Sequence, residues 1–175
     1  MAVVELVPYR DADLWLTEAL ETDPRTMAEL GGPWPAEHAR AAHKRRLAGV
    51  LDGTTWWFTI VAEPTIGPVG VIGAWASDWD GEALSETGWM VLPDHQGKGY
   101  ASAALGAMLD LARTDARWGD IHAFPGVTNG ASNALCRKFG FEQLEGGDAD
   151  YAGRQFPVNH WVWRAGNVSG SASAR

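Results

Sequence analysis

Residues 86–112 read ETGWMVLPDHQGKGYASAALGAMLDLA, and this stretch decides the fold. Residues 86–92 contain the β-branched and aromatic side chains typical of strands, and Pro93 ends the run because proline lacks a backbone donor. From residue 101 to residue 112, apolar side chains recur at the three- and four-residue spacing of an amphipathic helix. The glycines between them therefore lie where a predicted strand meets the N-terminus of a predicted helix.

This junction predicts an anion-binding site. Free N–H groups and the helix dipole attract phosphate, and Gly97 and Gly99 permit positive φ and a close approach of the backbone. A Walker loop is excluded because Lys98 is followed by glycine, and the dinucleotide fingerprint fails because Ser102 replaces its third glycine. The pattern QxxGxA over residues 96–101 remains, and a glycine turn that only joins strand to helix is the alternative interpretation.

The order of elements predicts a mixed α/β sheet with the order β-α-α-β-β-β-α-β-α-β-β. Helices after the fourth and fifth strands imply parallel pairing of those strands, and the earlier hairpins imply antiparallel pairing. The predicted strands cover residues 3–9, 54–63, 69–76, 86–92, 121–124, 141–144 and 155–164, with a hairpin loop at 77–82 and a polar, glycine-rich loop at 146–153. We expect one domain over residues 1–165 and a disordered tail over residues 166–175.

Composition restricts the partners of the chain. A net charge of −8 argues against a nucleic-acid surface and favours cationic ligands. No apolar run reaches the roughly 20 residues of a membrane span, the first ten residues show no leader pattern, and the single cysteine fits a reducing compartment. We therefore expect a cytoplasmic protein without a membrane partner. No metal-ligand spacing is present in the sequence, so we expect no metal.

A second motif, NGASNALCRKFGF, occupies residues 129–141. Together with QGKGYA at residues 96–101, it resembles the motifs Q/R-x-x-G-x-G/A and N-x-x-S/A-x-x-x-x-x-K-x-G-F of the GCN5-related N-acetyltransferases (GNAT). The segments GGPWP at 31–35 and HAFP at 122–125 look most like the branch related to ribosomal-protein N-terminal (Rim-type) acetyltransferases. The resemblance implies a GNAT-like fold whose fourth and fifth strands splay apart around acetyl-CoA.

By resemblance, the glycine-loop amides would hold the pyrophosphate of acetyl-CoA, and the end of the preceding strand would line its pantetheine arm. The second motif would face the cofactor from the other side, although helix capping is the alternative role for its Asn and Ser. The implied cofactor contacts are Val91, Leu92, Gln96, Gly97, Lys98, Gly99, Tyr100, Ala101, Asn129 and Ser132.

Acetyl transfer requires an unprotonated amine, an oxyanion donor and a proton for the departing thiolate. Glu86 is the candidate general base, because the family often places a glutamate on this strand, and an exposed carboxylate at the strand start is the alternative. The peptide N–H of Val91 or Leu92 would polarise the thioester carbonyl. Many members of the family have a tyrosine acid where this chain has Cys136, and this thiol could protonate the thiolate or serve only as a small core residue.

The acceptor amine is not encoded in a local motif. Trp34, in the loop of residues 31–35, and Trp89 are candidate substrate-binding residues, although this loop could be a plain connector between helices. The ten tryptophans suggest core packing or an aromatic-lined pocket. A small-molecule amine and a protein N-terminus both remain open as acceptors. His95, His122 and His160 are alternative bases, although a lone histidine is more often a surface or hydrogen-bonded residue. The family resemblance also implies a possible homodimer.

These observations predict an acetyl-CoA-dependent N-acetyltransferase in which the amine attacks the thioester directly in a ternary complex. A non-catalytic acyl-CoA-binding regulatory module on the same fold is the main alternative. A mononucleotide-binding protein that uses the same glycine loop is a second alternative, and competition between CoA and ATP would distinguish it.

Overall fold

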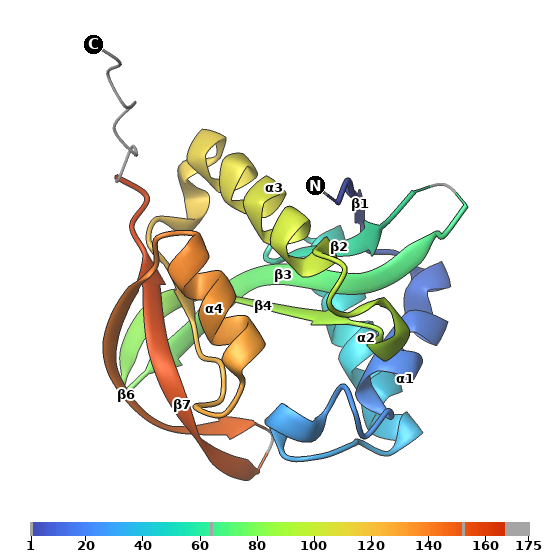
Figure 1. Cartoon of the computed structure of the whole chain (residues 1–175), viewed down its shortest axis with the longest axis horizontal. Helices are drawn as coiled ribbons and strands as arrows, with labels where there is room; N and C mark the ends of the chain where they lie inside the picture. Colours follow the sequence, from blue (N-terminus) through green and yellow to red (C-terminus); the bar gives the residue numbers. More distant parts are fainter. Residues whose placement is uncertain (1, 64, 152, 167–175) are drawn as a thin grey trace.

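A computed structural model describes residues 2–63, 65–151 and 153–166 of the chain (Figure 1). Its strands form one seven-stranded sheet in the order β1-β2-β3-β4-β5-β7-β6. The strands are β1 (Glu5–Pro8), β2 (Trp56–Val61), β3 (Pro68–Trp79), β4 (Glu82–Val91), β5 (Ile121–Ala123), β6 (Glu142–Tyr151) and β7 (Arg154–Trp163). The helices are α1 (Leu14–Glu21), α2 (Ala36–Leu51), α3 (Tyr100–Thr114) and α4 (Gly130–Lys138), with short 3-10 turns η1 (Asp11–Asp13), η2 (Ala28–Leu30), η3 (Pro93–His95) and η4 (Ala116–Trp118). All but the first residue of the predicted tail lie outside the described residues.

The predicted element order and the mixed sheet are confirmed. β4 and β5 pair in parallel, whereas each other neighbouring pair of strands in the sheet is antiparallel. The parallel pair is the one that α3 connects, as expected for a strand-helix-strand crossover. The two motifs therefore lie at the ends of adjacent strands.

One predicted hairpin loop is shorter than expected, and one predicted loop is a strand. β3 extends to Trp79 and β4 begins at Glu82, so the hairpin at 77–82 closes through Asp80 and Gly81, with φ values of 52° and 81°. Positive φ at both positions suits a tight two-residue hairpin turn. The glycine-rich residues 146–151 belong to β6, because pairing with the aromatic strand β7 outweighs their weak strand propensity.

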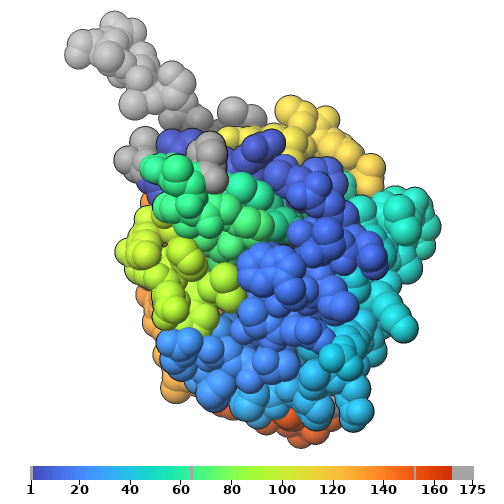
Figure 2. Space-filling view, turned by 90° about the vertical axis from the view of Figure 1, so that its right-hand side faces the viewer, coloured from blue at the N-terminus to red at the C-terminus, as the bar shows by residue number. Residues whose placement is uncertain are grey.

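The helices cover opposite faces of the sheet. Leu105 and Met108 of α3 are fully buried in a core cluster that includes Ile72 of β3. Leu16 and Leu20 of α1 are fully buried in a second cluster on the other face. Each of these side chains contributes roughly 1.5–3 kcal/mol by leaving water. The α1–α2 layer forms most of the surface in Figure 2, where the yellow-green loop that follows β4 lies beside it.

β4 and β5 separate after a short shared register. Their paired residues are Ser85 with Ile121 and Glu86 with His122. β4 then continues to Val91, while β5 ends at Ala123 and stays paired with β7. The sheet therefore opens along residues 87–91, as the GNAT-like fold predicts, and Glu86 lies where the opening begins. In the described part of the chain, the helices are too short or too polar to cross a lipid bilayer.

Candidate active site

The glycine loop leads directly into α3. Gly97 and Gly99 have φ values of 72° and 85°, which confirms the predicted left-handed positions. Gly99 is the N-cap residue of α3, and among the described residues no side chain bonds to the cap. The first intrahelical bond at this end runs from the Ala103 N–H to the Gly99 carbonyl at 3.0 Å. The amide N–H groups of the preceding turn are thus available to an anion, and the helix dipole favours one.

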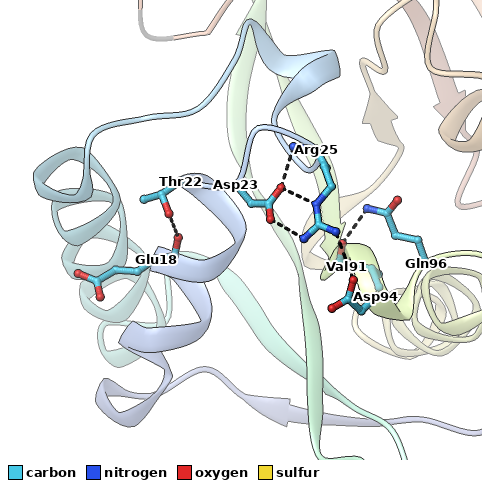
Figure 3. Close-up of polar contacts among 7 residues, drawn as sticks. All are labelled: Glu18, Thr22, Asp23, Arg25, Val91, Asp94 and Gln96. Carbon is cyan, nitrogen blue, oxygen red and sulfur yellow. Dashed lines mark hydrogen bonds and ion pairs between the residues drawn. The ribbon is translucent and has the colours of Figure 1, made fainter.

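Gln96 holds this loop against the end of β4. Its Nε2 donates to the Val91 carbonyl at 3.0 Å (Figure 3). The neighbouring Leu92 N–H donates to the Val69 carbonyl at 2.8 Å and is therefore used in the sheet. Backbone groups alternate in direction along a strand, so the Val91 N–H points away from β3, toward the opening. Of the two predicted oxyanion donors, only Val91 keeps its amide on that side.

Asn129 and Ser132 form the N-terminal cap of α4. The Asn129 Oδ1 accepts a hydrogen bond from the Ser132 N–H at 3.0 Å. This is the capping alternative considered for both residues. The cap does not itself exclude a contact with a cofactor, because the second lone pair of Oδ1 and the hydroxyl of Ser132 remain.

Asn133 is a structural residue that the sequence did not reveal. Its buried amide donates to the Gly126 carbonyl at 2.9 Å and accepts from the Trp161 indole N–H at 2.9 Å. It thereby joins the start of α4 to the loop after β5 and to β7. The available signal was an amide three residues before Cys136, on the same helix face. A buried, fully bonded amide fixes its neighbours because each lost partner costs about 1–3 kcal/mol.

Lys138 brings a cation to the first turn of α3, next to the glycine loop. Its Nζ donates to the Ser102 Oγ at 2.6 Å, which links the end of α4 to the first turn of α3. Lys98, in the loop itself, is exposed. Two of the three lysines of this acidic chain therefore lie beside the free amides of α3. Their charges favour a polyanionic ligand there.

Cys136 lies in the apolar core, with no exposed surface. Burial raises the pKa of its thiol to about 12. Proton transfer from such a thiol to a thiolate of ordinary pKa, about 8.5, is uphill. Of the two predicted roles, the geometry therefore favours the core residue over the general acid.

Glu86 is half-buried on the sheet face that α1 and α2 cover. Burial raises the pKa of its carboxyl, and the donor groups of Ser77 and Trp75 nearby partly oppose that rise. A carboxylate with a raised pKa is a stronger base, so this environment suits general-base chemistry near neutral pH. Side chains alternate along β4, so Glu86 shares a face with Met90, which packs against the α1 cluster, and lies away from α3.

Trp34 lies in a segment that we name the strap (residues 22–35). Its indole stacks on His38 of α2, with the ring centroids 4.0 Å apart. The guanidinium of Arg154, from the β6–β7 hairpin, lies 3.5 Å from the Trp34 ring centroid. The Tyr151 ring is 5.9 Å away, measured between centroids. Arg154 also donates to three carbonyls of the strap, those of Gly31, Gly32 and Pro33.

The strap also contacts two loops at the open end of the sheet. Arg25 bonds to Asp23 and reaches Asp94 of the β4–α3 loop, with Nη1 and Oδ1 3.3 Å apart (Figure 3). The Thr128 hydroxyl, in the loop after β5, donates to Glu29 at 2.5 Å. The strap, which carries Trp34, therefore borders the opening from the α1–α2 side.

Trp89 does not join this group. Its side chain is partly buried against the cluster that contains α3, on the sheet face opposite Glu86. The structure therefore brings Trp34, and not Trp89, to the α1–α2 side of the opening.

Two of the histidines considered as alternative bases lie side by side. His122 Nδ1 and His160 Nε2 are 2.7 Å apart, and burial lowers the pKa of both rings. A surface hollow near this pair lies at the start of β4 and β5, away from the glycine loop. It is lined by Ala83, Leu84, Ser85, Trp118, Asp120 and His122. It is not the predicted cofactor site. Within residues 2–63, 65–151 and 153–166, no three His, Cys, Asp or Glu side chains are grouped to hold a metal ion.

Comparisons with known proteins agree with this architecture. The family model of the acetyltransferase (GNAT) domain matches residues 4–142. A GNAT-family acetyltransferase from Bacillus anthracis superposes with a TM-score of 0.74 at 18% identity, covering 94% of this chain and 98% of that one. No curated protein sequence matches the chain.

Two further solved structures have named acceptors. Spermidine N-acetyltransferase from Vibrio cholerae, in complex with CoA and spermine, gives a TM-score of 0.74 at 17% identity and covers 93% of this chain and 95% of that one. An acetyltransferase from Salmonella typhimurium, which modifies the N-terminal serine of ribosomal protein L7/L12, gives 0.75 at 18% identity, with 94% and 96% covered. At these identities the likeness shows the fold alone.

Proposed function

Since the chain belongs to the acetyltransferase (GNAT) domain family, we propose that it transfers an acetyl group from acetyl-CoA to a primary amine, with Glu86 as the general base. The observation that carries this proposal is the juxtaposition at the opening of the sheet. The uncapped N-terminus of α3 lies beyond one end of residues 87–91, and the half-buried Glu86 lies at the other. A site for a phosphate-bearing cofactor and a base are thus joined by one strand.

The reaction follows from the positions of these groups. The glycine-loop amides, with Lys98 and Lys138 beside them, hold the pyrophosphate of acetyl-CoA. The Val91 N–H stabilises the oxyanion that forms when the amine nitrogen attacks the thioester carbonyl. Glu86 accepts the amine proton, directly or through water. The carbon–sulfur bond then breaks, and the CoA thiolate takes a proton from solvent, because Cys136 is too weak an acid.

The acceptor approaches from the α1–α2 side. We infer a cationic amine, because the chain carries a net charge of −8 and the strap presents Trp34 beside Tyr151. Both a small-molecule amine and a protein N-terminus satisfy this description, and the GGPWP segment resembles the Rim-type branch. We further propose a cytoplasmic enzyme that forms its ternary complex without nucleic acid, as a monomer or a homodimer.

An acceptor screen tests the function. Purified protein is incubated with acetyl-CoA and a panel of polyamines, amino acids, aminoglycosides and peptides, thiol release is followed, and the acetylated product is weighed by mass spectrometry. We expect turnover with at least one cationic amine. Absence of both thiol release and an acetyl-CoA-dependent thermal shift would refute the proposal.

Glu86→Gln separates an enzyme from a binding module. Loss of the base should lower kcat by about 10²–10⁴-fold while the Kd for CoA is unchanged. Wild-type protein that binds CoA and acetylates no amine would instead identify the non-catalytic acyl-CoA-binding module.

A further inference from the structure

Two tryptophans of the α1–α2 face pack over two glycines. The Trp57 and Trp75 rings are parallel within 6°, with centroids 5.0 Å apart. A Cβ on Gly73 would lie 2.6 Å from the Trp57 ring, and one on Gly88 would lie 3.0 Å from the Trp75 ring. Both glycines thus make room for the rings, and we name these four residues the tryptophan stack.

The outer end of the tryptophan stack rests on a buried ion pair. The Arg46 guanidinium lies 4.4 Å from the Trp57 ring centroid. Its Nη2 is 2.5 Å from Glu21 Oε1, and the two side chains are only 9% and 1% exposed. A guanidinium that is fixed by a carboxylate and stacked on an indole cannot turn freely, so Arg46 restrains the Trp57 ring.

The inner end of the tryptophan stack is beside Glu86. Trp75 and Glu86 are register partners on β3 and β4, which places their side chains next to each other on the same face. The Trp75 ring lies over Gly88, two residues along β4 from Glu86 and on the same side. Its indole N–H is a donor with no acceptor role, and a carboxylate is its natural partner.

We propose that Trp75 is the positioning residue for Glu86: its indole N–H donates to the carboxylate and fixes it at the opening of the sheet. The Glu21–Arg46 pair, through Trp57, keeps the indole in place. This inference rests on the proposed role of Glu86 as the base. It gives the α1–α2 layer a part in catalysis, since a carboxylate held in one orientation needs no rearrangement before it accepts the amine proton.

Several charged or titratable groups are near Glu86 and must stay constant in the test. Tyr151 of β6 is close enough for the charges of Glu86, Glu21 and Arg46 to influence its raised pKa. His122 is the register partner of Glu86 on β5. The Ser77 hydroxyl is a second donor on β3. None of these is altered by a change at Trp75.

Trp75→Phe removes the indole N–H and keeps an aromatic ring over Gly88. The carboxyl carbons of glutamate are labelled with carbon-13, the Glu86 signal is assigned with Glu86→Gln, and its titration is followed in wild type and variant. We expect the pKa of Glu86 to rise, because a donor to the charged form is lost. The acidic limb of the profile of kcat/KM against pH should move to higher pH. On that limb kcat/KM should fall by about tenfold, and on the plateau it should change little.

Trp56→Phe is the matched control. Trp56 precedes Trp57 on β2, but it packs against the opposite core cluster, near Trp118. It should leave both the Glu86 titration and the position of the acidic limb unchanged. Gly88→Ala is a second probe, because its methyl group would displace the Trp75 ring without removing the N–H. It should raise the pKa of Glu86 in the same direction.

An unchanged Glu86 titration in both Trp75→Phe and Gly88→Ala would overturn the proposal. So would a uniform loss of activity at every pH with the acidic limb in place, which indicates a packing role only. The titration needs no turnover, so it still decides the contact if the wild type acetylates no amine and the proposed function fails.

Discussion

The glycine loop occupies residues 96–101, whereas the residues that border the opposite side of the opening come from the strap, α2, β3 and the β6–β7 hairpin. The first region offers backbone amides to a ligand, which any sequence possesses, and needs only positive φ at Gly97 and Gly99. The second depends on side chains, such as Arg154 and Trp34, that are far apart in the chain. The proposed cofactor side is therefore local and should tolerate side-chain changes, while the proposed acceptor side is long-range and should be sensitive to them.

Arg46→Ala should test the acceptor side most severely. It leaves the buried Glu21 carboxylate without its partner, so the free energy of unfolding should fall by about 3–5 kcal/mol. Urea unfolding measures the loss. The double replacement Glu21→Leu with Arg46→Met should recover most of it, since no charge then remains buried. Equal losses in the single and double variants would contradict this account.

Arg154→Ala should release the strap from the β6–β7 hairpin. It removes three donations to strap carbonyls and the stacking on Trp34. Hydrogen exchange over residues 28–34 should accelerate by about tenfold or more, because these contacts limit local opening. Arg154→Lys keeps the charge but lacks the planar guanidinium, so it should only partly protect these residues from hydrogen exchange. The Kd for CoA should not change in either variant, and a weaker Kd would show that the two sides are coupled.

Gly99→Ala should act on the cofactor side alone. A Cβ at φ 85° costs about 1–2 kcal/mol, which favours a shift of the loop out of the left-handed conformation. CoA binding, measured by calorimetry, should therefore weaken by about tenfold. Gly130→Ala, at the first residue of α4, is the control, because its φ is not positive and no atom lies near its Cβ position. There CoA affinity should be retained. An undisturbed affinity in Gly99→Ala would show that the loop geometry is not needed.

The smallest effect should appear in the pH dependence of stability. Glu86 has a raised pKa in the folded state, so its contribution is fully present below its unfolded pKa, near 4.5, and is lost as the pH rises through the folded value. Glu86→Gln should therefore be more stable than wild type at neutral pH. This difference should disappear as the pH falls below about 4. Urea unfolding across this range measures it, and a constant difference would contradict burial of the charge.

The sequence predicted the regions in which neighbouring residues determine the conformation. The order of elements and the positive φ of Gly97 and Gly99 followed from residues a few positions apart. The hairpin at residues 77–82 was also predicted, but its two-residue turn at Asp80 and Gly81 and the strand character of residues 146–151 were not, although Asp-Gly is a hairpin signal. β6 exists because β7 lies beside it, and no local propensity expresses such pairing.

The same division between local and long-range determinants holds at the candidate site. The sequence by itself determined a glycine loop at the N-terminus of a helix and a glutamate on the preceding strand, because both lie within residues 86–101. The tertiary structure alone decided that the Leu92 amide is occupied in the sheet, that Cys136 is buried with a raised pKa, and that Trp89 faces away from Glu86. It also decided that Trp57 and Trp75 stack beside Glu86. These outcomes depend on which distant segments share a sheet face, and that is settled by packing rather than by neighbours in the chain.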